Sequence, residues 1–321
     1  MGLLAERFWV TCYASLALGF AIPLDGPLAN ALVAPSLCGI LFFTVLGIES
    51  SAVRAALSGA NLARSLGLTA VKLLVLPTIA WALFAGLLPS WATAALLVAA
   101  VPSGLSSPTL AGLRRPDAVA PALGLVMVSS ALAPLTIPLL LAVFTSADAD
   151  PIALAAAQAQ YIGALLVGPW LASRAIRRLA PEWVRRHTPR FRPIAVSCLV
   201  FLVFVAAAAC RRVIEAQGGG LSIAAVGLFT MTALAAFLGV ASLVVSRWLP
   251  APLAVAFPTG AIFMNNGLAI ALASRYFPND APVLVAAALV EVPILFGVHV
   301  VAKAADRLAQ ARGSRQAPSP T

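Results

Sequence analysis

Long apolar runs recur along almost the whole chain, and they restrict its possible folds more than any other feature. A helix needs about 20 residues to cross the hydrocarbon core of a bilayer. The apolar runs have approximate limits of 8–23, 29–48, 64–87, 91–113, 118–143, 152–173, 193–210, 221–246, 252–274 and 281–302. This pattern predicts an all-α, polytopic membrane protein of about ten transmembrane helices.

Composition agrees with a lipid environment. Hydrophobic residues make up 61% of the chain and charged residues only 10%, whereas soluble domains average about 45–50% apolar and about 25% charged residues. The polar gaps between the apolar runs are short, so no soluble domain is expected. The lipid bilayer is therefore the expected surrounding of nearly every segment.

The net charge of +10 indicates membrane orientation and not a nucleic-acid partner. Basic residues are concentrated in alternate loops: Arg7, Arg54, Arg64, Arg114, Arg115, Arg174, Arg177, Arg178, Arg185, Arg186, Arg190, Arg192, Arg247 and the tail from Lys303 to Arg315. The other loops hold Arg211, Arg212 and Arg275 together with Asp25, Asp148, Asp150 and Asp280. The positive-inside bias predicts a bacterial inner-membrane protein with both termini in the cytoplasm.

The cysteines give no sign of a metal centre. Cys12, Cys38, Cys198 and Cys210 are scattered through apolar runs without metal-binding or disulfide spacing. We expect no cofactor, and no metal beyond a weak sodium site. The sequence carries no signal for an oligomeric state.

Five spans followed by five indicate two halves, residues 1–150 and 151–303, with a disordered cytoplasmic tail over 304–321. Because five is odd, a duplicated five-helix unit must insert its second copy upside down. A matching motif supports this inverted repeat. The fourth span contains Pro102-Ser103-Gly104, and the ninth contains Pro258-Thr259-Gly260.

These motifs predict that the fourth and ninth helices break near the middle of the membrane. Proline removes a backbone hydrogen bond and glycine allows the chain to leave helical geometry. Freed backbone groups cannot face lipid, so the breaks should line a protein-enclosed cavity; simple kinks are the alternative. The polar residues at the breaks form the expected substrate site: Ser103, Ser106, Thr259, Asn265 and Asn266.

Three stretches at these positions resemble the bile acid:sodium symporter family. They are residues 102–108 (PSGLSSP), 133–138 (APLTIP) and 264–273 (MNNGLAIALA). The resemblance extends to the number and order of spans over nearly the full chain. It implies a ten-helix inverted repeat in which the fourth and ninth helices cross. It also implies a core of helices three to five and eight to ten that moves against a panel formed by the other four.

The resemblance also implies roles for single residues. Ser107 matches a sodium-ligating serine, and Ser130 matches a hydroxyl ligand on the fifth helix. Asn266 matches an asparagine beside the substrate, and Asn265 stands where the family has a sodium-binding glutamine.

Two positions depart from the family pattern. Pro108 replaces an asparagine of the sodium site, and Ala261 replaces the acidic residue that bridges the two sodium ions. A dehydrated cation needs oxygen ligands with negative charge nearby. These departures argue against sodium coupling.

Glu291 offers a different coupling group. It lies near the middle of the tenth span, and intramembrane ionisable side chains are functional candidates. One hypothesis is proton coupling through Glu291, and the other is a structural ion pair with Lys72 of the third span. Lys72 has two further interpretations: snorkelling to the cytoplasmic surface, or supplying positive charge for an anionic substrate.

The sequence therefore predicts a secondary active transporter of a small organic anion, either a carboxylate or a sterol-like acid. Amide groups at half-helix N-termini suit an anion, and alternating access would expose the site to each side. The coupling ion would be Na⁺ or H⁺. The alternatives are a channel or a non-transporting receptor or scaffold. No enzyme is expected, because Ser106 and Ser107 have no nearby base: His187 lies in a loop and His299 near the inner surface.

Overall fold

The structure is a computed structural model that describes residues 2–22, 24, 26–48, 51, 54, 56, 58–145, 151–216 and 220–316. Over these residues the chain consists of helices joined by short turns, with a single isolated β-bridge and no strand. The prediction of an all-α fold is confirmed.

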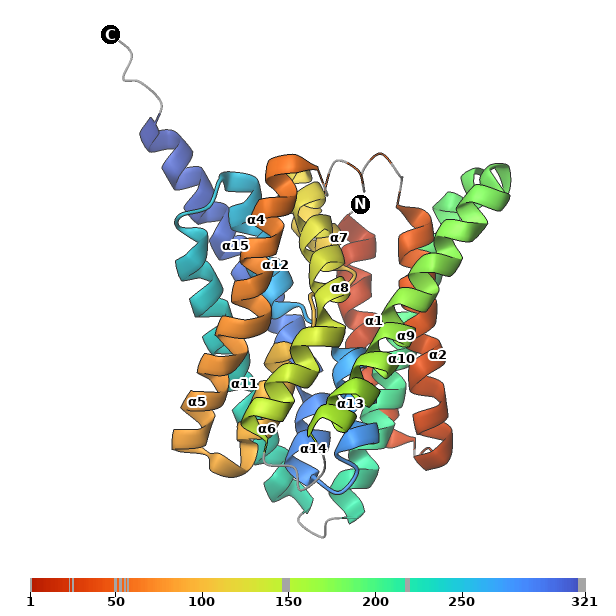
Figure 1. Cartoon of the computed structure of the whole chain (residues 1–321), viewed down its shortest axis with the longest axis vertical. Helices are drawn as coiled ribbons and strands as arrows, with labels where there is room; N and C mark the ends of the chain where they lie inside the picture. The colour runs from red at the N-terminus through yellow and green to blue at the C-terminus, as the bar shows by residue number, and fades with distance from the viewer. Residues whose placement is uncertain are drawn as a thin grey trace.

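The helices run alongside one another in a bundle (Figure 1). Those of the first half are α1 (Gly2–Ala21), α2 (Gly26–Gly47), α4 (Gly59–Ala70), the π-helical η1 (Val71–Val75), α5 (Leu76–Leu87), the 3₁₀ turn η2 (Pro89–Trp91), α6 (Ala92–Ala100), α7 (Ser107–Gly112), the 3₁₀ turn η3 (Pro116–Ala118) and α8 (Val119–Phe144). Those of the second half are α9 (Pro151–Leu179), α10 (Pro181–Ala216), α11 (Gly220–Ser246), α12 (Ala251–Ile262), α13 (Asn266–Tyr276), α14 (Ala281–Leu289) and α15 (Glu291–Gln316).

Several helices are long and apolar enough to cross a membrane. Within the described residues, 3 do so as single stretches, Asn61–Leu87, Pro116–Phe144 and Ser222–Ser246, and up to 5 do so if each bent pair counts as one span. One bent pair is Ala281–Leu289 with Glu291–Arg312, at an angle of 43°. Pro293 explains this bend, because it has no N–H to donate to the carbonyl of Leu289.

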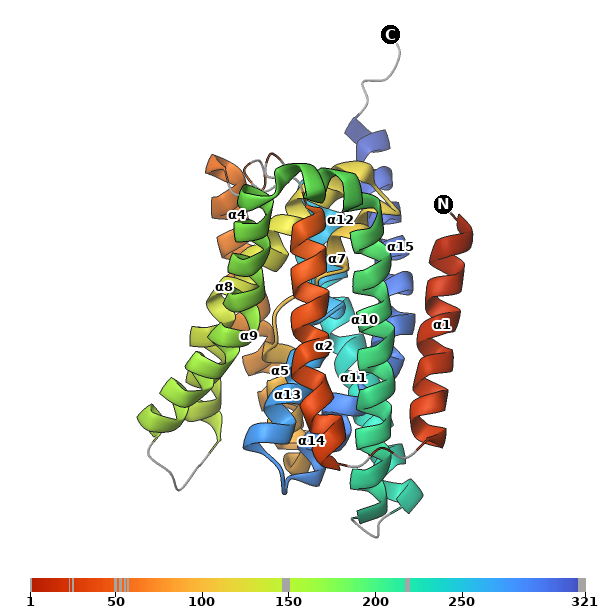
Figure 2. The same cartoon turned by 90° about the vertical axis from the view of Figure 1, so that its right-hand side faces the viewer.

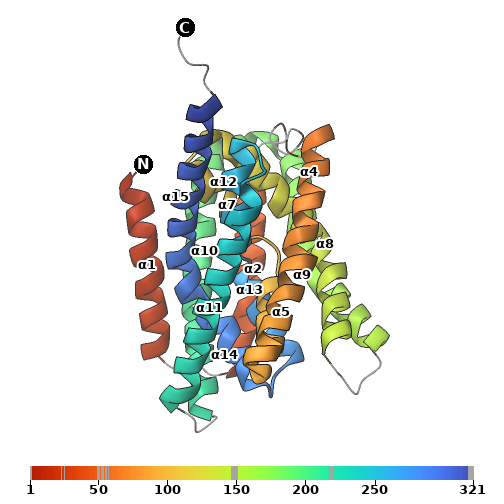
Figure 3. The ribbon, with the colours of Figure 1, turned by 90° about the vertical axis from the view of Figure 1, so that its left-hand side faces the viewer.

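The short helices α6, α7, α12 and α13 lie inside the bundle and longer helices surround them (Figures 1 and 2). On one side, α2 packs against α9 and α10, and α1 packs against α10. On the other side, α12 contacts α8, α11 and α15. Figure 3 shows α1 and α15 running side by side in projection, with the start of α1 and the end of α15 toward the same end of the molecule.

Two segments differ from the sequence prediction. Residues 181–192, which lie outside the predicted spans 152–173 and 193–210, are the first turns of α10; Pro181 occupies the first helical position, where its missing N–H has no cost. The expected disordered tail is helical as far as Gln316. Its alanines favour helix, and Gln310 Nε2 donates to Asp306 Oδ2 at 2.8 Å one turn earlier. Residues 317–321 lie outside the described range.

Candidate functional site

Both predicted helix breaks are present, but the second is not at its predicted place. The first separates α6 from α7 over residues 101–106, beside Pro102 and Gly104. The second separates α12 from α13 over residues 263–265, so α12 continues through Pro258 and Gly260. A single proline removes only one hydrogen bond, and the helix around Pro258 keeps its remaining bonds. Asn265 instead starts α13, and its Oδ1 accepts from Leu268 N at 3.4 Å.

The two unwound segments cross and satisfy each other's backbone groups. Gly104 N donates to Phe263 O at 2.6 Å, and Asn265 N donates to Pro102 O at 2.8 Å. Ser103 and Met264 thereby form an antiparallel β-bridge, the only one among the described residues. Backbone groups that leave a helix inside lipid need such partners, because each unsatisfied group costs several kcal/mol, on the order of 2–7. We call residues 101–106 and 263–265 together the crossing.

A glycine from each motif allows the two segments to approach closely. A Cβ on Gly104 would lie 2.6 Å from Phe263 Cδ1 and 2.8 Å from Met264 O. A Cβ on Gly260 would lie 3.0 Å from Ser103 Oγ. The repeated Pro-x-Gly motif therefore reflects packing of each half against the other, in addition to backbone freedom.

Lys72 is buried against the C-terminal end of α6, with 2% of its surface exposed. Its Nζ donates to Ala99 O at 2.7 Å and to Val101 O at 2.9 Å, which are carbonyls at the C-terminal end of α6. The snorkelling interpretation is therefore wrong. The ion pair with Glu291 is also absent, since the ion pairs of the described chain are Arg115–Asp117, Arg185–Glu182 and Arg211–Glu215.

A small cavity lies against the crossing. It is lined by both unwound segments, by the start of α13, by Ala288 and Glu291 near the bend between α14 and α15, and by apolar side chains of α1, α2 and α10. Its free volume is about 30 Å³, enough for one or two water molecules. An organic anion does not fit into it in this conformation.

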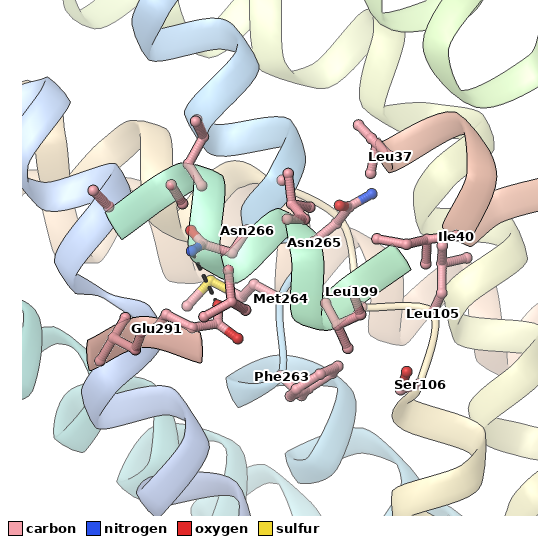
Figure 4. A pocket seen from close by; sticks show the side chains of 18 residues that line it. Leu37, Ile40, Leu105, Ser106, Leu199, Phe263, Met264, Asn265, Asn266 and Glu291 are labelled. Carbon is pink, nitrogen blue, oxygen red and sulfur yellow. Dashed lines mark hydrogen bonds between the residues drawn. The ribbon is translucent and has the colours of Figure 1, made fainter. Parts of the chain in front are cut away.

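The polar groups of the cavity gather at its Asn265–Asn266 side. Asn266 Nδ2 donates to Glu291 Oε2 at 3.0 Å. Figure 4 shows Asn265 and Asn266 pointing away from each other at the start of α13, with the dashed bond joining Asn266 to Glu291. Asn265 Nδ2 and Asn266 Oδ1 have no hydrogen-bond partner and are buried. The Asn265 amide thus keeps one open donor, and the Asn266 amide keeps one open acceptor beside the Glu291 carboxyl group.

The other expected site residues are only partly brought together. Ser106 lines the cavity. Ser103 does not; its backbone N–H donates to Ser129 Oγ at 3.2 Å. Thr259 Oγ1 donates to Val255 O within its own helix at 2.7 Å and does not line the cavity. The sequence argument missed Ser129, whose only signal was its position next to Ser130 on α8.

The expected sodium ligands do not form a cation cage here. Ser107 Oγ donates to Phe263 O at 3.3 Å, and Ser130 Oγ has no hydrogen-bond partner. Pro108 and Ala261 contribute no side-chain oxygen. Sodium binds best among several oxygen ligands with a nearby negative charge. Of the expected ligand positions, only Ser107 and Ser130 therefore carry a hydroxyl oxygen behind the crossing, and neither Pro108 nor Ala261 adds a charge.

A comparison with protein families matches more than half of the chain. The model of the Sodium Bile acid symporter family matches residues 34–217, which include the first break, α8, α9 and all of α10. No curated protein matches the chain.

Proposed function

The chain belongs to the sodium bile acid symporter family, and on that premise we propose that it is a secondary active transporter of a small organic anion that works by alternating access. Members of this family are transporters and not enzymes. The substrate classes that we propose are carboxylates and sterol-like acids.

We propose that the helices form ten spans in two inverted halves, 1–150 and 151–303. In this arrangement α4 with α5, α6 with α7, α12 with α13, and α14 with α15 each make one span, and six further helices make the others. The start of α1 and the end of α15 lie toward one end of the bundle, together with the arginine-rich junctions α7–α8, α9–α10 and α11–α12 (Figure 1). Because both ends of the chain lie toward the same end of the bundle, we propose an even number of spans. The positive-inside rule supports a cytoplasmic location of that end in the bacterial inner membrane.

The small cavity beside the crossing is the observation that carries the transport proposal. It lies between the crossing and the apolar side chains of α1, α2 and α10. Because about 30 Å³ excludes an organic anion, binding requires these outer helices to separate from the crossing. A binding site that must open at a boundary between two groups of helices is what alternating access needs.

The chemistry of the cavity suits an anion. The start of α13 carries the positive end of an eleven-residue helix dipole. Asn265 Nδ2 is a buried donor without a partner beside it. A carboxylate oxygen of the substrate would satisfy that donor, whose desolvation otherwise costs about 1–3 kcal/mol.

Glu291 supports proton coupling in preference to sodium coupling. It is 5% exposed, has no basic partner among the described residues, and lines the same cavity. An ionised Glu291 and a substrate anion in so small a space would repel each other strongly. An anionic substrate would therefore enter together with a proton on Glu291, and the two would leave together.

The first prediction follows from this coupling. In liposomes, the purified protein should take up labelled cholate or labelled lactate along an inward proton gradient and not along a sodium gradient. Glu291→Gln removes the ionisable group and keeps an oxygen for Asn266. This variant should lose gradient-driven accumulation, by about tenfold or more, and retain exchange of substrate across the membrane. Glu182→Gln, at an exposed position of α10, is the control.

Other outcomes separate the alternatives. Sodium-driven uptake that Glu291→Gln leaves unchanged would contradict proton coupling. Flux that never accumulates substrate against its gradient would indicate a channel. Absence of uptake of either anion under both gradients, with binding retained, would favour a receptor or scaffold.

A further inference from the structure

Lys72 lies in the only π-helical segment of the described chain, η1. Leu76 N donates to Val71 O, five residues earlier, and the next residue, Pro77, has no N–H for Leu73 O. Proline thus accounts for the local change from α to π geometry, which is typical of functional positions in helices. The segment turns a lysine toward the crossing in a helix that is otherwise apolar at this depth.

The surroundings of the Lys72 ammonium are those of a bound cation. Ala99 O and Val101 O belong to the interrupted end of α6, where the last carbonyls have no helical partner. That end carries about half a negative elementary charge from the helix dipole. In broken-helix transporters, unwound carbonyls and half-helix C-termini are the groups that coordinate a coupling cation. Here a covalently attached cation contacts them at 2.7 and 2.9 Å.

No carboxylate compensates this charge. Glu291, which lines the cavity, accepts from Asn266, and the ion pairs of the described residues lie elsewhere in the chain. Ala261, on α12 behind the crossing, is 1% exposed and packs among apolar side chains. The dipole and the two carbonyls therefore provide the main stabilisation of the ammonium, and the ammonium is their main counter-charge.

We propose that Lys72 is a tethered cation that takes the place of a bound metal ion at the crossing: it neutralises the carbonyl end of α6 and holds the crossing in its paired geometry, so that the folded core does not require sodium. Lys72 is then a positioning residue and has no contact with substrate. The inference rests on the proposed function for its meaning in transport, since it explains how the core can do without the ion. Its test uses no transport measurement, so either proposal can fail alone.

The test measures the thermal unfolding temperature (Tm) of the detergent-purified protein. The wild-type Tm should be the same in sodium chloride and in choline chloride. Lys72→Ala leaves two buried carbonyl groups without a donor and empties the space of the lysine side chain. Its Tm should fall by about 5 °C or more. Sodium or propylammonium ions should restore at least half of that loss. Tetramethylammonium should not, because its four methyl groups keep its charge away from the carbonyl oxygens.

Two further variants make the result specific. Lys72→Met fills the space of the lysine side chain with an apolar one, so its Tm should fall and no cation should restore it. Lys303→Ala removes an exposed lysine from α15 and should leave the Tm unchanged in every salt. Loss of stability in Lys72→Ala without rescue by either cation would indicate a purely structural lysine and overturn the proposal. Equal stability of Lys72→Ala and wild type would also overturn it.

The wild-type measurement keeps the proposal testable if the substituted proteins do not fold. A saturable rise of the wild-type Tm in sodium, compared with choline at equal ionic strength, would mean that the core still uses a bound sodium ion. Independence of sodium over the same range is the expected result.

Discussion

Gly104 is the residue on which the close approach of the two broken helices most depends. Replacing it with alanine puts a Cβ within 2.8 Å of a backbone oxygen, Met264 O, which cannot move without disturbing the crossing. We expect Gly104→Ala to destabilise the protein by about 1–3 kcal/mol, measured as a fall in Tm. Gly86→Ala in α5, where a Cβ meets nothing within 4 Å, should leave the Tm unchanged or raise it slightly. Similar Tm values for the two variants would contradict the packing argument.

Single residues differed in how far the sequence revealed their roles. Asn266 and Glu291 were expected to matter because a polar group inside an apolar span is costly to bury. Their mutual hydrogen bond joins residues that are 25 positions apart in the sequence, so it has no local signal. For Lys72 the sequence suggested the carboxyl group of Glu291, the cytoplasmic surface or an anionic substrate as partner. Its actual partners are backbone carbonyls, which every residue has, so only the position of the helix break identifies them.

The crossing makes an element-scale prediction. Ser103 and Met264 form the non-hydrogen-bonded pair of the bridge, since their neighbours carry the two backbone bonds. Such a pair has Cα atoms about 4.5 Å apart, within the range that a disulfide spans. In a background with the four native cysteines replaced, Ser103→Cys with Met264→Cys should cross-link under mild oxidant, seen as loss of free thiol by mass spectrometry. Neither single variant should react in this way.

Transport by the oxidised double variant tests whether the crossing moves as one unit. If the two broken helices stay together while the outer helices separate from them, uptake should persist after oxidation. Loss of uptake that a reductant reverses would show that the crossing itself opens.

Helix breaks were easier to predict in number than in position. Pro102 and Gly104 lie at the first break, so the local motif located it correctly. The same motif in α12 is helical, and the chain unwinds only at Phe263, just before Asn265 caps α13. Tertiary contact decides between these places, because Gly260 must stay helical for Ser103 to pack against it. The helical start of α10 and the helical end of α15 were missed because charge and proline were taken as signs of irregular chain.

The whole molecule predicts opposite sides for two junctions. The start of α10 and the junction between α13 and α14 lie toward opposite ends of the bundle (Figures 1 and 2). The first contains Arg186 and the second contains Asn279. In intact cells expressing a cysteine-free background, an impermeant maleimide should label Asn279→Cys and not Arg186→Cys. Both should react after the membrane is permeabilised, which controls for accessibility. Labelling of both in intact cells would contradict the ten-span topology.

The pairing at the crossing also determines an order of events during synthesis. Pro102 O and Gly104 N find their partners in Asn265 and Phe263, which the ribosome adds some 160 residues later. At about 5–20 residues per second, that delay lasts on the order of ten seconds or more. During this time the nascent first half contains an interrupted helix whose polar backbone has no permanent partner. The first half is therefore an incomplete unit until the second has been inserted, and its biogenesis depends on whatever shelters that gap from lipid.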